Sequence, residues 1–408
     1  MAQEMTSRER AYAALNHQEP DRVPICFGGT LSATNIVECA PEGRVCSDLY
    51  SYLGITGAEP IKIGDICNVV VNLDERVMQR LHSDFRNVTP SEPPAVVQPD
   101  GTKIAHYFCG AKIKRIGYYD EYFGTPMRYM TTKKDIDEYP SWPEDTNDFM
   151  EGVVERARYL HEETDYFVVG ESYAYAFPFN GYGILSGMDK WLTDIKIRPK
   201  FYHQLCEKMM EVAIQRGDKF YSAVGKYLDG ALMFDDLGTQ QGGLMSHDDF
   251  AEFYKPYTAE IIRNIRKHLR PEAKIIIHCC GSIYSYIPDL IEIGVDVLNP
   301  VQPLARNMEP WRLKQEFGKQ IAFLGGFDIQ KLLPLGSVER VEEGAKKLIQ
   351  EYAPGGGFIF AASHNIEPDT PPENIVAMFD TAYEYGKYPI PRQSGLNFVD
   401  YITSLNLR

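Results

Sequence analysis

The sequence predicts an α/β fold: a (β/α)8 (TIM) barrel with an N-terminal extension and a β-hairpin insertion near residues 86–132. Two observations carry this prediction. Short apolar runs that end in polar residues and glycine alternate with longer stretches of helical spacing. The runs number about eight, the count that closes a parallel barrel. The candidate strands are residues 23–29, 61–70, 166–172, 230–238, 274–281, 295–302, 321–328 and 357–365.

The stretches between these strands carry the helices that would cover a parallel sheet. Helical patterns occupy residues 198–224, 246–269 and 337–353, and Ser246 and Ser337 are candidate N-caps. Near-continuous apolar strands are typical of parallel sheets that are buried on both faces. A doubly wound open sheet is the alternative, but no G-x-G-x-x-G turn follows the first strand.

The chain reads as one barrel domain over residues 1–408, with residues 1–22 as a helical extension. No Gly/Ser linker and no short repeat marks a boundary. Residues 86–132 depart from the alternation, because polar and apolar residues alternate there between Gly and Pro turns, as in antiparallel hairpins. We interpret this segment as an insertion beside the barrel mouth, either a lid or partner surface or a structural cap.

Charge and cysteine content exclude several classes of protein. A formal charge of −15 argues against a nucleic-acid-binding surface, which would gather Lys and Arg on one face. The eight cysteines show no regular spacing, so free thiols in a reducing compartment are expected rather than a disulfide framework. Neither a signal peptide nor a run long enough to span a bilayer is seen, so a cytoplasmic protein is expected.

The fifth candidate strand ends in His278, Cys279 and Cys280. Catalytic groups of such barrels lie at the C-terminal ends of the strands. Because successive side chains of a strand alternate in direction, His278 and Cys280 share a face and Cys279 turns away. Imidazole and thiolate together suit zinc. A strained redox pair of the two cysteines and an inert buried thiol remain as alternatives.

Other strand ends supply carboxylates and a second histidine. Asp235 and Asp236 point to opposite faces, so one of them faces the site, and we favour Asp236 as a catalytic group. Glu171 ends an apolar strand, where a charge requires a partner, and it is a second candidate catalytic group. His364 precedes a Pro-rich turn and is a candidate ligand, proton donor or ordinary loop histidine.

Aromatic and amide side chains near these ends are candidates for substrate binding. An aromatic cluster follows Glu171 directly and could form the wall of a pocket for a flat or apolar ligand, although packing of a long loop is the commoner role of such clusters. The predicted substrate-binding residues are Tyr173, Tyr175, Phe177, Asn299, Gln302 and Asn365.

At these residues the chain resembles the uroporphyrinogen decarboxylase superfamily, which includes zinc-dependent methyltransferases of corrinoid systems. The resemblance runs over nearly the whole chain. Its most specific pieces are "PDRVP", "FDDLGTQ", "HCCGSIYSYIPDLIEIGVDVLNPVQ", "LGGFDIQ" and "PGGGFIFAASHNIEPDTPPENI". The resemblance implies a (β/α)8 barrel, in agreement with the strand count.

The resemblance separates two activities. The decarboxylases carry an Arg-rich R-Q-A-G-R motif that holds the acidic porphyrinogen, whereas the matching segment here, "PICFGGTLSATN", has no arginine. The methyltransferases carry an H-x-C motif, matched by His278 and Cys280, and a cysteine in a G-C-G-x-x-P turn. His364 of "SHNIEP" stands where that cysteine would be. The third zinc ligand is therefore open between His364, Glu171 and Asp236.

The resemblance thus implies a cytoplasmic zinc methyltransferase that moves methyl between a methylated small molecule and the cobalt of a corrinoid on a separate protein. The aromatic loop favours an aryl methyl ether as methyl donor, so the enzyme would demethylate it. Neither nucleic acid nor membrane is an expected partner, and an oligomer is compatible with the sequence. Two alternatives remain: a metal-free decarboxylase or lyase of a small acid, with Asp236 or His364 as proton donor, and a barrel that binds a corrinoid or tetrapyrrole without catalysis.

Overall fold

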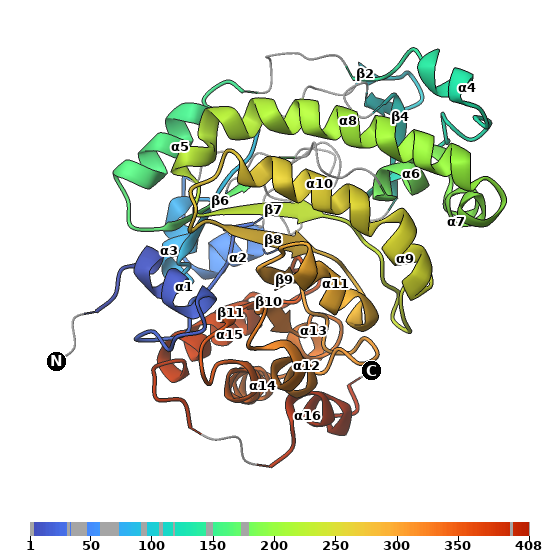
Figure 1. Cartoon of the computed structure of the whole chain (residues 1–408). Coiled ribbons are helices and arrows are strands. Elements are labelled where there is room, and N and C mark those ends of the chain that lie inside the picture. The colour runs from blue at the N-terminus through green and yellow to red at the C-terminus, as the bar shows by residue number, and fades with distance from the viewer. Residues whose placement is uncertain are drawn as a thin grey trace.

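The computed structural model describes residues 4–30, 33, 47–57, 73–90, 96–105, 109–116, 119–143, 150–172, 179–391 and 395–407. Within them, seven parallel strands form one sheet in the order β1-β6-β7-β8-β9-β10-β11 (Figure 1). Their bounds are β1 Phe85–Val88, β6 Phe167–Glu171, β7 Gly230–Phe234, β8 Lys274–His278, β9 Val297–Asn299, β10 Ala322–Phe327 and β11 Phe358–Ala362.

The sheet closes into a barrel through the segment around Ile25. Ile25 forms a parallel bridge with Phe360 of β11, and the N–H of Cys26 donates to the Phe360 carbonyl over 2.9 Å. On its other side, the Ile25 carbonyl accepts from the N–H of Asp84, next to β1. This segment therefore occupies the eighth position of the ring, and the predicted (β/α)8 barrel is confirmed.

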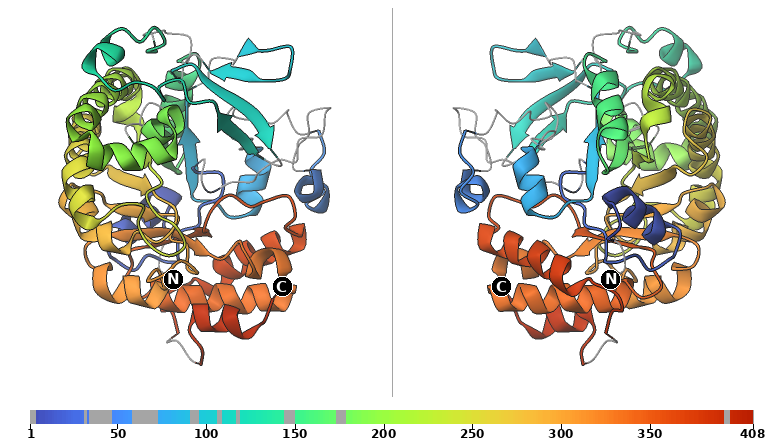
Figure 2. Two further views of the ribbon diagram at one scale, coloured as in Figure 1. Left: turned by 90° about the vertical axis from the view of Figure 1, so that its right-hand side faces the viewer. Right: turned by 90° about the vertical axis from the view of Figure 1, so that its left-hand side faces the viewer.

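One boundary of the prediction is wrong. β1 belongs to the barrel, although residues 86–88 were assigned to the insertion, because a buried four-residue strand next to hairpins has no distinctive periodicity. The predicted strand at 61–70 lies outside the described residues. The insertion itself is a four-stranded antiparallel sheet, on one side of the barrel in Figure 2. Its strands are β2 Val96–Val97, β3 Lys103–Ala105, β4 Ala111–Ile116 and β5 Tyr119–Phe123.

Helices cover the outside of the barrel sheet (Figure 1). Ser246 caps α9 by accepting from the N–H of Asp249, as predicted, whereas the single helix expected over 246–269 divides at Tyr254. The remaining helices are α2 Ser47–Tyr52, α3 Glu75–Arg80, α4 Lys133–Asp137, α5 Val153–Glu162, α6 Phe179–Ser186, α7 Met188–Ile197, α8 Pro199–Val224, α9 His247–Phe253, α10 Lys255–Arg266, α11 Ile287–Glu292, α12 Pro310–Phe317, α13 Leu332–Leu335, α14 Val338–Tyr352, α15 Pro372–Tyr385 and α16 Phe398–Ser404.

Two apolar layers follow from the alternation of side chains along the strands. Residues such as Phe167, Val169 and Ile276 point inward and fill the barrel, while residues such as Val168 and Ile277 point outward and pack under the helices. Helix α1 (Ser7–Leu15) contributes Ala11 and Leu15 to the inner layer. None of the helices within the described ranges combines the length and apolar character required to cross a bilayer.

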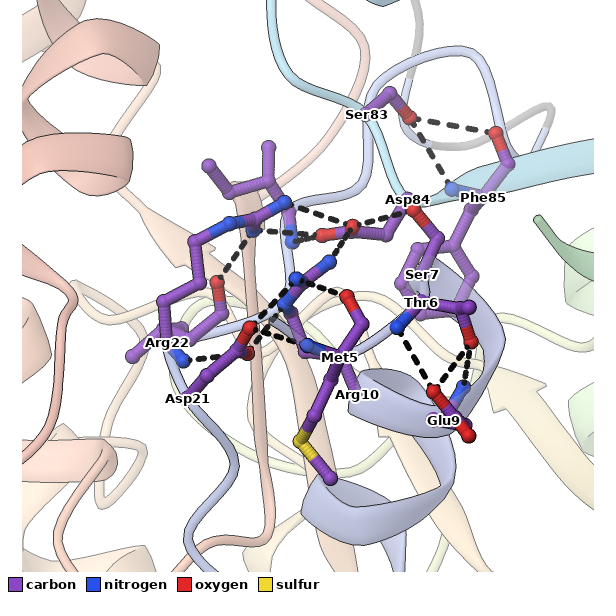
Figure 3. A network of polar contacts seen from close by, with 12 residues as sticks. Met5, Thr6, Ser7, Glu9, Arg10, Asp21, Arg22, Ser83, Asp84 and Phe85 are labelled. Atoms are coloured by element: carbon purple, nitrogen blue, oxygen red, sulfur yellow. Dashed lines mark hydrogen bonds and ion pairs between the residues drawn. The ribbon is translucent and has the colours of Figure 1, made fainter. Parts of the chain in front are cut away.

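A buried carboxylate joins α1, the Ile25 segment and β1. Asp84 accepts hydrogen bonds from the guanidinium groups of Arg10 and Arg22, at 2.8–2.9 Å, and from the hydroxyl of Ser7 at 2.8 Å (Figure 3). It also accepts from the N–H of Ile25 at 2.9 Å. Both arginines are buried, so their charges require an anionic partner, and the two share the carboxylate of Asp84.

Asp84→Asn is therefore expected to lower the free energy of unfolding by about 3–5 kcal/mol, the usual effect of removing one partner of a buried ion pair. Urea unfolding followed by circular dichroism measures the loss. Asp137→Asn is the control, because its ion pair with Lys133 is exposed, and it should change the unfolding midpoint only slightly. Equal effects of the two substitutions would contradict the role assigned to Asp84.

Candidate functional site

The C-terminal ends of β7, β8 and β9 lie side by side in register. Phe234 pairs with His278, and His278 pairs with Asn299. Ile276 belongs to the inner apolar layer, so His278, two residues further along β8, also points into the barrel. This confirms the orientation expected from the alternation of the strand.

Asn299 lies beneath the imidazole of His278. His278 Nδ1 is 2.7 Å from Asn299 Oδ1, and Asn299 Nδ2 donates to the Leu324 carbonyl over 3.1 Å. The Asn299 side chain is fully buried. Both ends of the amide are engaged within the barrel, and the substrate-binding role expected for Asn299 stays a prediction.

Cys280 follows β8 and brings its thiol to the same ring. Its Sγ lies 3.3 Å from His278 Nε2, and its N–H donates to Asp236 Oδ1 over 2.8 Å. Burial, and then the charge of Asp236, raise the pKa of the Cys280 thiol well above its usual range. Cys279 points the other way, into the apolar core, where its sulfur accepts from the N–H of Leu237 at 3.3 Å. The thiol of Cys280 therefore lies beside His278, whereas that of Cys279 lies in the apolar core.

His364, after β11, completes a cluster of three metal-binding side chains. Its ring is 5.3 Å from that of His278 between centroids, and the ligand atoms of His278, Cys280 and His364 all lie within 4.8 Å of one another. Burial, and then the neighbouring His278, lower the pKa of His364 to about 4, so its imidazole is neutral near pH 7. Among the described residues, no other group of three such side chains comes this close together.

The two carboxylates considered as third ligands lie outside this cluster. Asp236 Oδ1 is 3.8 Å from His278 Nε2, and the side chain is 47% exposed while it accepts from the backbone of Cys280. Glu171 is fully buried at the end of β6, two residues beyond the inward-facing Val169. Asp235 instead accepts from the N–H of Asn180 near the start of α6 over 2.8 Å.

Two glycines fix the turn that carries Cys280. Gly281 has φ +77°, and a Cβ there would lie 2.6 Å from the backbone carbon of Gly238, in the loop after β7. The two loops can approach so closely only without side chains at these positions. The N–H of Ser282 donates to the Thr239 carbonyl over 2.7 Å, and the N–H of Gly281 donates to Gln302 Oε1 over 2.7 Å. The turn that carries the thiol is therefore held through its backbone by the loops after β7 and β9.

A cavity of about 390 Å³ opens onto the cluster. It is lined by Cys280, Gln302, Ile329, Gln330, Pro334, His364, Glu367 and Asp369. Gln302, for which a substrate-binding role is predicted, lies in this lining, and Asn365, the residue after His364, is buried. His364 was expected here, whereas Ile329, Gln330, Pro334, Glu367 and Asp369 were not, because only the "FDIQ" and "EPDT" turns signal them. Tyr173, Tyr175 and Phe177 lie outside the described residues.

The donor set fits zinc. One thiol and two imidazoles are ligands that zinc accepts together, and a catalytic zinc site typically has three protein ligands and one position for water or substrate. Cys280 and His364 both border the cavity, so the open position would face it. Loss of the thiol proton, which burial disfavours here, is the step that a nearby cation assists.

The chain is similar in sequence to curated proteins named uroporphyrinogen decarboxylase. A protein named uroporphyrinogen decarboxylase from Nitrosococcus oceani is 25% identical over 205 residues, 50% of this chain and 54% of that protein. One from Schizosaccharomyces pombe is 28% identical over 152 residues, 35% and 40% of the two chains. The chain thus spans about half the length of the curated relatives it matches.

The fold comparison covers more of the molecule. The structure of a methyltransferase from Methanosarcina mazei superposes with a TM-score of 0.62 at 19% identity, over 94% of this chain and 99% of that one, and so shows the same fold. The model of one protein family, described as uroporphyrinogen decarboxylase (URO-D), matches residues 124–385, which is more than half of the chain. The protein therefore belongs to the uroporphyrinogen decarboxylase (URO-D) family.

Proposed function

We propose that this protein is a zinc-dependent methyltransferase that moves a methyl group between a methylated small molecule and the cobalt of a corrinoid on a separate protein. The observation that carries the proposal is the convergence of His278, Cys280 and His364 at the mouth of the barrel. The fold shared with a methyltransferase is compatible with it. A zinc ion would be held by these three side chains.

Zinc, when bound, supplies a Lewis acid that polarises a methoxyl oxygen or lowers the pKa of an acceptor thiol. Residues of the chain supply the ligand atoms that would hold this ion. Cys280 supplies its sulfur from a turn whose backbone N–H groups donate to Asp236 and Gln302. His364 supplies a neutral imidazole, because its pKa is lowered. Asp236 holds the backbone of Cys280 and places a negative charge beside the cluster.

The charge of the cavity bears on the substrate. Within the described part of the chain, the eight residues that line it include Glu367 and Asp369 but neither Lys nor Arg. Such a lining provides no cationic partner for a carboxylate or sulfonate, whose binding usually relies on Arg or Lys. We therefore favour an uncharged methyl donor, of which an aryl methyl ether is the leading case, over a small anionic thiol. On this reading the enzyme demethylates its substrate.

Decarboxylation of an acid is the second candidate, because the family description and the curated relatives carry that name. In this reading Asp236 or His364 would donate the proton and no metal would take part. Two observations weigh against a polyacidic substrate: residues 24–35 contain no arginine, and no Lys or Arg is found among the described residues that line the cavity. The metal-binding cluster also has no role in that reaction.

The purified protein is expected to contain about one zinc ion per chain, in keeping with a three-ligand catalytic site. Cys280→Ala should lose most of it, because the thiolate is the ligand with the highest preference for zinc in this set. Cys279→Ala is the matched control: the neighbouring thiol points into the apolar core and should leave the zinc content unchanged. Inductively coupled plasma mass spectrometry measures the metal.

Carefully prepared wild-type protein that holds no zinc and takes up none would refute the metal mechanism. Equal zinc loss in the two cysteine variants would show that the loss reports unfolding. Circular dichroism of both variants separates these cases.

A mixture of the enzyme, a cobalt(I) corrinoid protein and a methoxylated aromatic compound should develop the absorption spectrum of methyl-cobalt. His278→Ala should lower the rate at least about 100-fold, because one metal ligand is lost. Anionic methyl thioethers should react more slowly than neutral methyl ethers.

If no neutral or anionic methyl donor produces the methyl-cobalt spectrum, the methyltransferase proposal is refuted. Release of carbon dioxide from uroporphyrinogen by the same preparation, unaffected by a chelator, would establish the decarboxylase instead. Any turnover that requires His278 excludes a purely binding role.

A further inference from the structure

We propose that Asn299 is a positioning residue that fixes the tautomer of His278, so that Nδ1 carries the proton and Nε2 presents its lone pair to the cluster with Cys280. The tautomer follows from contacts within the barrel. Its consequence for metal binding rests on the function proposed above.

The orientation of the Asn299 amide is determined by its partner on β10. Asn299 Nδ2 donates to the Leu324 carbonyl, an acceptor, over 3.1 Å. The reverse orientation would place two oxygen atoms against each other at that position. The amide oxygen therefore faces His278 Nδ1 at 2.7 Å, and since an oxygen can only accept, Nδ1 must carry the hydrogen.

The other side of the ring agrees with this assignment. Cys280 Sγ lies 3.3 Å from His278 Nε2, within the range of a hydrogen bond to sulfur. With the hydrogen on Nδ1, Nε2 has a free lone pair and is the acceptor of this contact. Asp236 Oδ1, at 3.8 Å from Nε2, is beyond hydrogen-bond distance and does not compete for a proton there.

The surroundings leave the ring little freedom to turn. His278 is buried between the rings of Phe234 and His364, whose centroids lie 5.6 and 5.3 Å away. Asn299 is equally constrained, because its carbonyl accepts from the N–H of Cys279 over 2.8 Å, in the ladder between β8 and β9. Residue 299 therefore reaches the ring from a fixed neighbouring strand.

The backbone after Asn299 is held as well. The N–H of Gly326 donates to the Pro300 carbonyl over 3.0 Å. Gly325 has φ +120°, and a Cβ there would lie 2.1 Å from the Pro300 oxygen, so this approach between β9 and β10 requires glycine. In other proteins, loss of a residue that orients a metal-binding histidine typically lowers metal affinity by about 10- to 100-fold.

Nitrogen-15 NMR of metal-free protein with labelled histidine tests the tautomer directly. The signals of His278 are assigned by their absence in His278→Gln. We expect Nδ1 to carry the proton in the wild type and in Asn299→Asp, whose carboxylate keeps an accepting oxygen on His278 although it loses the bond to the Leu324 carbonyl. Asn299→Leu removes the acceptor, so Nε2 should become protonated in a substantial fraction of molecules.

A matched control separates positioning from folding. Asn374 is another buried asparagine, and its Nδ2 donates to the carbonyls of Leu333 and Gly336 at 2.8–2.9 Å rather than to a residue of the cluster. Asn374→Leu should destabilise the protein in a similar way but leave the tautomer of His278 unchanged. Zinc affinity, measured by competition with a chromophoric chelator, should fall about 10- to 100-fold in Asn299→Leu and recover in Asn299→Asp.

An unchanged tautomer in Asn299→Leu, or the same change in Asn374→Leu, would overturn the proposal. If the tautomer follows the prediction but no variant binds zinc, the positioning role stands and the proposed metal function fails. If zinc binds equally to wild type and Asn299→Leu while the tautomer shifts, Asn299 orients the ring without tuning the metal, and the second part of the proposal is refuted.

Discussion

The parallel register between β7, β8 and β9 is the constraint on which the site depends. His278 pairs with Phe234 on one side and with Asn299 on the other. This register points its ring into the barrel and places it against the side chain of Asn299. A shift by one residue would turn His278 outward, under the helices, and bring Cys279 inward instead. The apolar layers on the two faces of the sheet oppose such a shift, since it would exchange their residues.

The two ends of the barrel are built differently. At the N-terminal end, Asp84 gathers Arg10, Arg22 and the Ile25 segment, so charges are buried with their partners and hold the ring closed. At the C-terminal end, the polar groups of Cys280 and His364 border a cavity. Stability and chemistry are thereby separated along the barrel axis, as is usual for this architecture.

Family membership and site geometry answer different questions. The URO-D family match identifies the evolutionary group and agrees with the barrel, but a shared fold does not fix a reaction. The cluster of one thiol and two imidazoles is what favours metal chemistry over metal-free decarboxylation. The described residues that line the cavity include no Lys or Arg, which supports the proposed preference for an uncharged substrate.

The sequence by itself determined the alternation of strands and helices, and with it the barrel, because hydrophobic periodicity is a local property. It also determined that His278 and Cys280 share a face while Cys279 turns away, since that follows from the geometry of a single strand. Only the tertiary structure decided that His364 joins them, that β1 belongs to the barrel, and that Asn299 supports the imidazole. Each of these depends on contacts between residues distant in the chain, whose register and burial no local pattern encodes.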